Sequence, residues 1–243
     1  MRALITGGAV RLGRAVATAL HEAGFSVALH YRASSGAARS LAEEFGGALL
    51  VQADLSTVEG CASVVDAVNR WGGVDVLVNS AAAWEACPVE QIDPVRWDAM
   101  QALNVRAPFL LTQGLLASLR ASELPGGGLV LNITDIAGER PARGYAHYNV
   151  SKAGLTMLTR TLALELAPQV RVNGIAPGTV LPPEELPDEQ LIAIRDTIPA
   201  GRFGTARDIA RAAIYFALHA PYVTGQVLAV DGGRSVGGPM EAG

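Results

Sequence analysis

Lysine is almost absent from this sequence of 243 residues. Lysine and arginine together number 19, but only Lys152 is a lysine, and the net charge is −4. The sequence contains no run of basic residues, which argues against a nucleic-acid-binding protein. Because an arginine is bulkier than a lysine and cannot adjust its charge, the one amine side chain indicates a functional position.

Cysteine and long apolar segments are scarce as well. Cys61 and Cys87 have neither the spacing of metal ligands nor that of a disulfide framework, so we expect two reduced thiols and no metal site. The apolar residues 3–5 form too short a segment for a secretory signal peptide. No apolar run approaches the length of about 18 residues that a membrane span requires. These absences favour a cytoplasmic protein that does not associate with membranes.

The sequence is rich in apolar residues, and its short apolar segments alternate with segments of helical pattern. Half of its residues are hydrophobic and 17% are charged, which permits a large buried core. Short apolar segments alternate with helical ones, without repeats or a linker. This alternation predicts an α/β protein with one domain over residues 1–243, in which a doubly wound parallel sheet of about seven strands carries helices on both faces. The strands are expected at residues 3–6, 26–30, 48–52, 75–78, 129–133, 170–175 and 227–230.

A glycine-rich turn follows the first expected strand and precedes a helix over residues 14–23. In it, Gly7 and Gly13 enclose Arg11 and Leu12. Glycines let a backbone approach a pyrophosphate closely, and the N-terminus of the helix adds N–H donors and a positive dipole. The spacing differs from the usual G-x-G-x-x-G. The position of the turn, after the first strand of an alternating chain, therefore indicates the dinucleotide phosphate site.

The end of the second strand indicates which dinucleotide binds. The ribose of NADH usually meets an acidic residue here, but residues 30–35 contain none. Arg32, which follows Tyr31, and the hydroxyl of Ser34 suit a 2′-phosphate through charge-assisted hydrogen bonds. This segment predicts NADPH as the cofactor, and the alternative is a polar loop with one solvated arginine.

Other strand ends also carry candidate ligand contacts. Asp54, after the third strand, could meet the adenine amino group or cap the helix expected at residues 57–71. The small residues 79–83 leave room for a flat cofactor. Trp84 then either stacks on a planar substrate or packs against its own loop. Asn104 lies among apolar residues of a long helix expected at 94–119, where a buried amide needs a water or a backbone partner.

Tyr148 and Lys152 lie four residues apart in an expected helix that continues to about residue 167, so they share one face. A cation beside a phenol lowers its pKa, and a tyrosine so tuned can transfer a proton near neutral pH. The alternative is an ordinary amphipathic pair.

Asp135 ends the fifth strand, where ligands collect in open α/β sheets. Residues 181–204 are Pro-rich, acidic and irregular, with a short helix expected at 188–196, and are predicted to form a lid over the substrate.

Together, these motifs resemble the short-chain dehydrogenase/reductase family along the whole chain. The matching residues include Gly7, Gly13, Asp54, Leu55, Asn79, Ala81, Asn104, Tyr148, Lys152, Pro177, Gly178 and the Asp231-Gly232-Gly233 ending. The resemblance implies a Rossmann-type fold, catalysis by Tyr148, Lys152 and Asn104, and assembly into a homotetramer. It also implies a set of cofactor contacts: Gly7, Arg11, Leu12, Gly13, Tyr31, Arg32, Ser34, Asp54, Leu55, Asn79, Ala81, Tyr148, Lys152, Pro177 and Gly178.

Two departures from the general family resemble its pteridine reductase branch, and residues 79–84 look especially like those of bacterial dihydromonapterin reductases, which also reduce dihydrofolate. The central glycine of the family's cofactor turn falls at Arg11, and the usual catalytic serine falls at Asp135. An ionised aspartate accepts hydrogen bonds but cannot donate one to a ketone oxygen.

The branch resemblance implies NADPH-dependent hydride transfer to a dihydropterin, dihydromonapterin or dihydrofolate ring. Arg11, Trp84, Asp135 and Tyr148 would bind this substrate. Asp135 would also be catalytic, since the proton would reach the ring nitrogen through Asp135, Tyr148 and a water that Asn104 anchors. The alternatives are a 3-oxoacyl thioester reductase or other carbonyl reductase of the same family, and a nucleotide-sensing protein that binds the cofactor without turnover.

Overall fold

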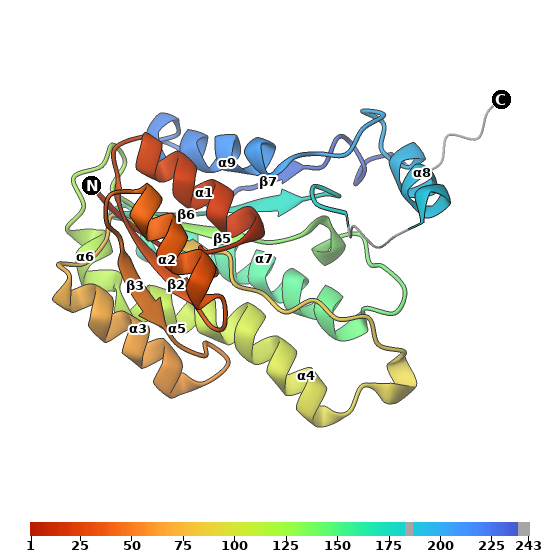
Figure 1. Ribbon diagram of the computed structural model, residues 1–243, viewed down its shortest axis with the longest axis horizontal. Coiled ribbons are helices and arrows are strands. Elements are labelled where there is room, and N and C mark those ends of the chain that lie inside the picture. Colours follow the sequence, from red (N-terminus) through yellow and green to blue (C-terminus); the bar gives the residue numbers. More distant parts are fainter. Residues whose placement is uncertain (183–186, 238–243) are drawn as a thin grey trace.

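The computed structural model contains one parallel sheet with the strand order β3-β2-β1-β4-β5-β6-β7 (Figure 1). The structure describes residues 1–182 and 187–237. The strands are β1 (Arg2–Ile5), β2 (Ser26–Tyr31), β3 (Leu49–Gln52), β4 (Val76–Asn79), β5 (Gly128–Ile133), β6 (Val170–Pro177) and β7 (Val227–Val230). This order confirms the predicted doubly wound, Rossmann-type α/β fold. The order reverses between β1 and β4, and such a switch point is where open α/β sheets bind ligands.

Helices cover both faces of the sheet (Figure 1). They are α1 (Arg11–Glu22), α2 (Ser35–Glu44), α3 (Val58–Arg70), α4 (Pro94–Gln101), α5 (Ala107–Gly114), α6 (Leu116–Arg120), α7 (Ala146–Leu166), α8 (Asp188–Asp196) and α9 (Ala206–Ile214). Side chains alternate across β1, so that Ile5 packs in the core beneath α1, α2 and α9, while Leu4 packs in the core beneath α3, α5 and α7. Within the described residues, no helix combines the length and the apolar character needed to cross a membrane.

The long helix expected at residues 94–119 is present, but it is irregular. A π-helical turn, η2 (Ala102–Arg106), separates α4 from α5, and α6 is a further short helix. Pro108 lacks the N–H that would bond to the carbonyl of Asn104 in a regular helix, so a local widening of the helix is expected here. The turn places Asn104, which is 1% exposed, inside the protein.

The observed helix starts reflect their caps. Thr57 accepts a hydrogen bond from the backbone N–H of Gly60 and so caps α3. Thr205 and Asp208 form a reciprocal capping box at the start of α9. The predicted helix over residues 188–196 is present as α8, beyond the carboxyl end of β6 (Figure 1). The predicted lid, residues 181–204, includes residues 183–186, which lie outside the described residues.

Candidate active site

The glycine-rich turn after β1 places backbone atoms that carry no side chains at the switch point of the sheet. A Cβ atom on Gly13 would lie only 2.1 Å from the carbonyl oxygen of Gly7, and Gly7 itself has a φ of +63°. Thr6 then accepts hydrogen bonds from the backbone N–H groups of Ser80 (2.9 Å) and Ala81 (3.0 Å). These bonds join the turn to the end of β4. Only glycine fits at position 13, and the cradle that results is suited to a pyrophosphate at the start of α1.

Arg11 occupies a position that a glycine would adopt more easily. Its φ is +50°, in the left-handed region, and it is the residue at which α1 begins. The sequence predicted that α1 begins only at Arg14, because the glycine turn obscured the helical start. The exposed guanidinium reaches across the site and donates a hydrogen bond to the carbonyl of Leu181 at 3.3 Å. Arg11 therefore lies between the turn and the segment that follows β6.

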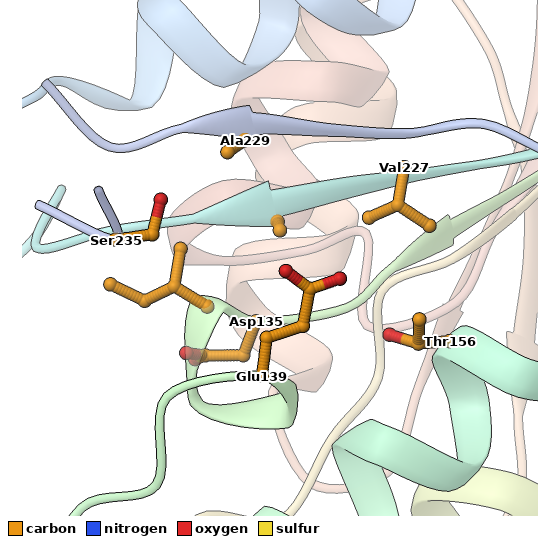
Figure 2. A pocket seen from close by; sticks show the side chains of 8 residues that line it. Asp135, Glu139, Thr156, Val227, Ala229 and Ser235 are labelled. Atoms are coloured by element: carbon orange, nitrogen blue, oxygen red, sulfur yellow. The ribbon is translucent and has the colours of Figure 1, made fainter. Parts of the chain in front are cut away.

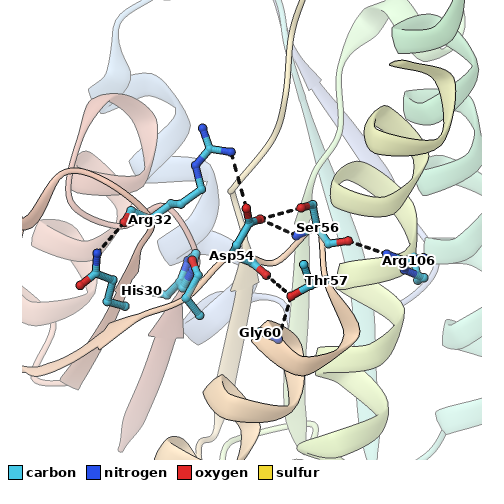
Figure 3. Close-up of polar contacts among 9 residues, drawn as sticks. His30, Arg32, Asp54, Ser56, Thr57, Gly60 and Arg106 are labelled. Carbon is cyan, nitrogen blue, oxygen red and sulfur yellow. Dashed lines mark hydrogen bonds and ion pairs between the residues drawn. The ribbon is translucent and has the colours of Figure 1, made fainter. Parts of the chain in front are cut away.

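Arg32 and Asp54, which follow the neighbouring strands β2 and β3, lie side by side, as Figure 3 shows. Arg32 has a 69% exposed side chain, and its guanidinium lies 4.0 Å from the carboxylate of Asp54. Asp54 accepts hydrogen bonds from the backbone N–H and the hydroxyl of Ser56, which lower the pKa of its carboxyl group. Asp54 does not cap α3, since Thr57 does so. The Arg32 side chain is mostly exposed and its contact with Asp54 is long, so it can turn toward a phosphate.

The remaining predicted cofactor contacts differ in which of their polar groups are available to a ligand. Ser34 precedes α2 without a side-chain capping bond, which leaves its hydroxyl for other partners. Leu55 is 3% exposed and can offer only its backbone. Asn79 is 3% exposed, and its amide donates to Asn132 at 2.8 Å, which joins β4 to β5. Pro177 ends β6, and the backbone N–H of Gly178 bonds to Val230 at 3.1 Å.

Tyr148, Lys152 and Asp135 come together, as the sequence predicted. The hydroxyl of Tyr148 donates a hydrogen bond of 2.7 Å to Oδ2 of Asp135, and the other carboxylate oxygen accepts from the N–H of Ala137. Lys152 is 3% exposed; its Nζ donates to the carbonyl of Ile133 at 2.9 Å and lies 5.7 Å from the centre of the Tyr148 ring. The end of β5 and the first turns of α7 thus place a carboxylate, a phenol and an amine in one cluster.

The expected lowering of the Tyr148 pKa is wrong for this arrangement. Burial raises the pKa of the Tyr148 phenol, and the negative charge of Asp135 raises it further. Burial also lowers the pKa of Lys152 to about 8, although the charge of Asp135 acts in the opposite direction. The amine points at a carbonyl rather than at the phenol oxygen, so burial, together with the charge of Asp135, keeps the pKa of the phenol raised. Tyr148 is therefore a protonated donor to Asp135 near neutral pH.

Asn104 holds the segment after β4. Its Oδ1 accepts from the N–H of Ala83 at 2.8 Å, and its Nδ2 donates to the carbonyl of Ala83 at 3.0 Å and to the hydroxyl of Ser151 at 2.9 Å. Both ends of the amide are therefore bonded to protein atoms. This pairing fixes residue 83, next to Trp84, against α7, and the predicted role of Asn104 toward a relay water stays a prediction.

Trp84 stacks on Tyr145, a residue that the sequence analysis did not select. The two rings lie 5.2 Å apart and 12° from parallel, and Trp84 is still 60% exposed. Tyr145 in turn meets Tyr148 edge-on at 6.3 Å. The signal for Tyr145 was its position three residues before Tyr148, on the same side of the chain. The two stacked rings form an aromatic surface that leads from solvent to the phenol.

A small cavity lies beside Asp135, as Figure 2 shows. Its volume is about 30 Å³, and Glu139, Thr156 and Ser235 add polar groups to its wall. A volume of this size holds water but no organic substrate. The surface bounded by Trp84, Tyr145 and Tyr148, by contrast, is open to solvent on the side of Trp84.

Comparisons with known proteins agree with this geometry. A family model described as Enoyl-(Acyl carrier protein) reductase matches residues 8–235. The chain is 32% identical to pteridine reductase 1 of Leishmania tarentolae, with 96% of each protein covered. It is also 32% identical to an acetoacetyl-CoA reductase of Shinella zoogloeoides, with 96% of the chain and 97% of that protein covered. A solved structure described as an NAD(P)-dependent gluconate 5-dehydrogenase of Beutenbergia cavernae with bound NADP superposes with a TM-score of 0.89, at 34% identity and 97% coverage of both chains.

Proposed function

The chain belongs to the short-chain dehydrogenase/reductase family of NAD(P)-dependent oxidoreductases, and from this premise we propose that it is an NADPH-dependent reductase of pterin-type rings. The substrate would be a dihydropterin, dihydromonapterin or dihydrofolate. One observation carries the proposal: the carboxylate of Asp135 lies within hydrogen-bond distance of the Tyr148 hydroxyl, where the family usually has a serine. The exposed face of Trp84 beside it provides a surface for a flat heterocycle.

The residues at the switch point fit NADPH. The bare backbone at Gly7 and Gly13 admits the pyrophosphate, while Arg11 adds positive charge above the start of α1. Arg32 would hold the 2′-phosphate, and Lys152 would hold the nicotinamide ribose. When bound, NADPH supplies the hydride that reduces the ring.

The chain itself orients the substrate and supplies the proton. An ionised Asp135 accepts hydrogen bonds from the N–H groups of a pterin, which a ketone lacks. Tyr148 holds its proton on the phenol oxygen, 2.7 Å from Asp135, so the pair can deliver a proton to a neighbouring ring nitrogen. Burial of Tyr148 and Lys152 keeps bulk water from this proton.

A comparison of substrates tests the proposal directly. We expect NADPH oxidation with dihydrobiopterin, dihydromonapterin or dihydrofolate to exceed that with an acetoacetyl thioester by at least about 100-fold in kcat/KM, because a site built for hydrogen bonds discriminates strongly. The second candidate is a 3-oxoacyl thioester reductase, favoured by the equal identity to the acetoacetyl-CoA reductase. Ready turnover of the thioester without turnover of any pteridine would establish that candidate instead.

Replacing Arg32 by alanine tests the choice of cofactor. We expect the KM for NADPH to rise by about 10-fold or more, because a hydrogen bond to a charged group contributes about 1.5–3 kcal/mol. The KM for NADH should not rise, since NADH has no 2′-phosphate. The control is Arg39→Ala, which removes an exposed arginine within α2. If Arg32→Ala left the preference for NADPH over NADH unchanged, another group would have to hold the 2′-phosphate.

Assembly into a homotetramer stays a prediction from the family resemblance. Exposed apolar side chains on α4, α5 and α7, among them Val95, Phe109, Met157 and Leu164, support an interface on this side of the molecule. Burial of such side chains against a second copy would remove apolar surface from water.

A further inference from the structure

His30 links two parts of the site that the sequence analysis treated separately. It lies near the end of β2, beside Asp54 (Figure 3), and is 3% exposed. Its Nδ1 lies 3.2 Å from the backbone nitrogen of Gly7, in the pyrophosphate turn. Its Nε2 lies 3.1 Å from the carbonyl oxygen of Ala53, the residue directly before Asp54. One imidazole ring therefore spans from the phosphate end to the adenosine end of the cofactor site.

These two partners define one tautomer of the ring. The N–H of Gly7 can only donate, so Nδ1 must carry a lone pair. The carbonyl of Ala53 can only accept, so Nε2 must carry the proton. A protonated imidazolium has an N–H at both positions and would face the N–H of Gly7 with a second donor. The observed arrangement therefore requires a neutral His30.

The backbone of His30 holds the same turn. Its carbonyl oxygen accepts a hydrogen bond from the N–H of Gly8 at 3.1 Å. Two successive N–H groups of the turn are thus bound by one residue, and this orients the bare backbone near Gly13. A change of ring charge would act on a tightly packed segment, since a Cβ added at Gly7 would lie only 3.2 Å from the Cα of Ala81. The turn has little room to adjust in another way.

We propose that His30 is a positioning residue for the dinucleotide, whose neutral ring sets the pyrophosphate turn against the adenosine loop and whose protonation weakens cofactor binding. The ring touches neither the reacting atoms nor, in this geometry, the substrate surface. The proposal concerns the cofactor and does not depend on which substrate the enzyme reduces.

Burial and the neighbouring charges together determine the direction in which the pKa of His30 shifts. Burial lowers the pKa of His30 and outweighs the opposing influences of the Ala53 hydrogen bond and the Asp54 carboxylate. Asp54 is itself paired with Arg32, which weakens its influence on the ring. A free histidine has a pKa of about 6.5. The unfolded chain therefore binds this proton at a higher pH than the folded protein, so the free energy of unfolding decreases as the pH falls below about 6.5.

Two variants separate the two hydrogen bonds. In His30→Asn, the side-chain oxygen takes the place of Nδ1 and can still accept from Gly7, but nothing reaches Ala53. In His30→Gln, the side-chain nitrogen takes the place of Nε2 and can still donate to Ala53, but the acceptor for Gly7 is lost. His219→Asn is the matched control, because that imidazole is exposed and lies in the turn after α9.

The measurement is the Kd of NADP, which is stable in acid, by calorimetry from pH 8 to pH 5. For the wild type and for His219→Asn, we expect a rise of about 10-fold, which corresponds to the loss of one hydrogen bond. His30→Asn should bind within about 3-fold of wild type at pH 8 and should lack the rise caused by His30, keeping only the change that titration of the 2′-phosphate causes. His30→Gln should already bind about 10-fold more weakly at pH 8. The 2′-phosphate also titrates, with a pKa of about 6, but it contributes equally to all four proteins.

Identical pH dependence in the wild type and His30→Asn would overturn the proposal. Should the variants not fold, nuclear magnetic resonance of the wild-type ring gives a second measurement. Bound NADP is expected to lower the pKa of His30 further, because binding and protonation oppose each other. A titration of His30 that NADP leaves unchanged, or a ring protonated on Nδ1, would equally contradict it.

Discussion

Replacing Tyr148 by phenylalanine is expected to reduce kcat/KM by at least about 100-fold, the effect of removing a general acid. The hydroxyl is the only part of Tyr148 that changes, and it lies 2.7 Å from the Asp135 carboxylate in a buried position. Without it, the phenolic proton that bonds to Asp135 is lost. The measurement is steady-state NADPH oxidation with the best substrate of the comparison above.

Controls distinguish lost chemistry from lost structure. Tyr222→Phe removes a phenol that is fully exposed and should leave kcat/KM unchanged. Tyr148 is also a predicted cofactor contact, but Tyr148→Phe keeps the pyrophosphate turn and Arg32, so this variant should still bind NADP. A variant that retains turnover within about 3-fold would exclude Tyr148 as the proton donor.

The positions of the site residues could be predicted from the sequence because parallel strands end at one edge of the sheet. Gly7, Asp54, Asn79, Asp135 and the α7 pair were all recognised beside such ends, and the strand order confirms this arrangement. Residues on one helix face, such as Tyr148 and Lys152, follow equally from spacing. These features depend on local periodicity, which a sequence displays directly.

The properties of the site residues could not be predicted in the same way. The spacing placed Lys152 near Tyr148 but did not show that its amine bonds to Ile133, so the direction of the Tyr148 pKa shift was wrong. Tyr145 acquires its role only when Trp84, far away in the sequence, stacks on it. His30 acts through Gly7 and Ala53, which β2 meets on opposite sides in the sheet. Such effects arise from contacts between distant segments and from burial.

Replacing Asp135 by serine should exchange the preferred substrate. We expect kcat/KM for dihydropterins to fall by about 10- to 100-fold, since hydrogen bonds to a charged group contribute about 1.5–3 kcal/mol. Turnover of an acetoacetyl thioester should rise in the same variant, because a serine hydroxyl can donate to a ketone oxygen and an ionised aspartate cannot. A serine can still cap the turn at Ala137, so the loop should keep its conformation.

The test compares two rates in each variant, the turnover of the pterin and the turnover of the thioester. Asp135→Asn keeps the shape of the side chain but removes its charge, so it should lose pterin turnover as Asp135→Ser does. Asp98→Ser, at an exposed position in α4, is the control for nonspecific effects. If Asp135→Ser reduced pterins as fast as the wild type, the carboxylate would have no special role. Loss of both activities with an unchanged Kd for NADP would instead show that Asp135 serves Tyr148 whatever the substrate, since the phenol donates to this carboxylate in the observed geometry.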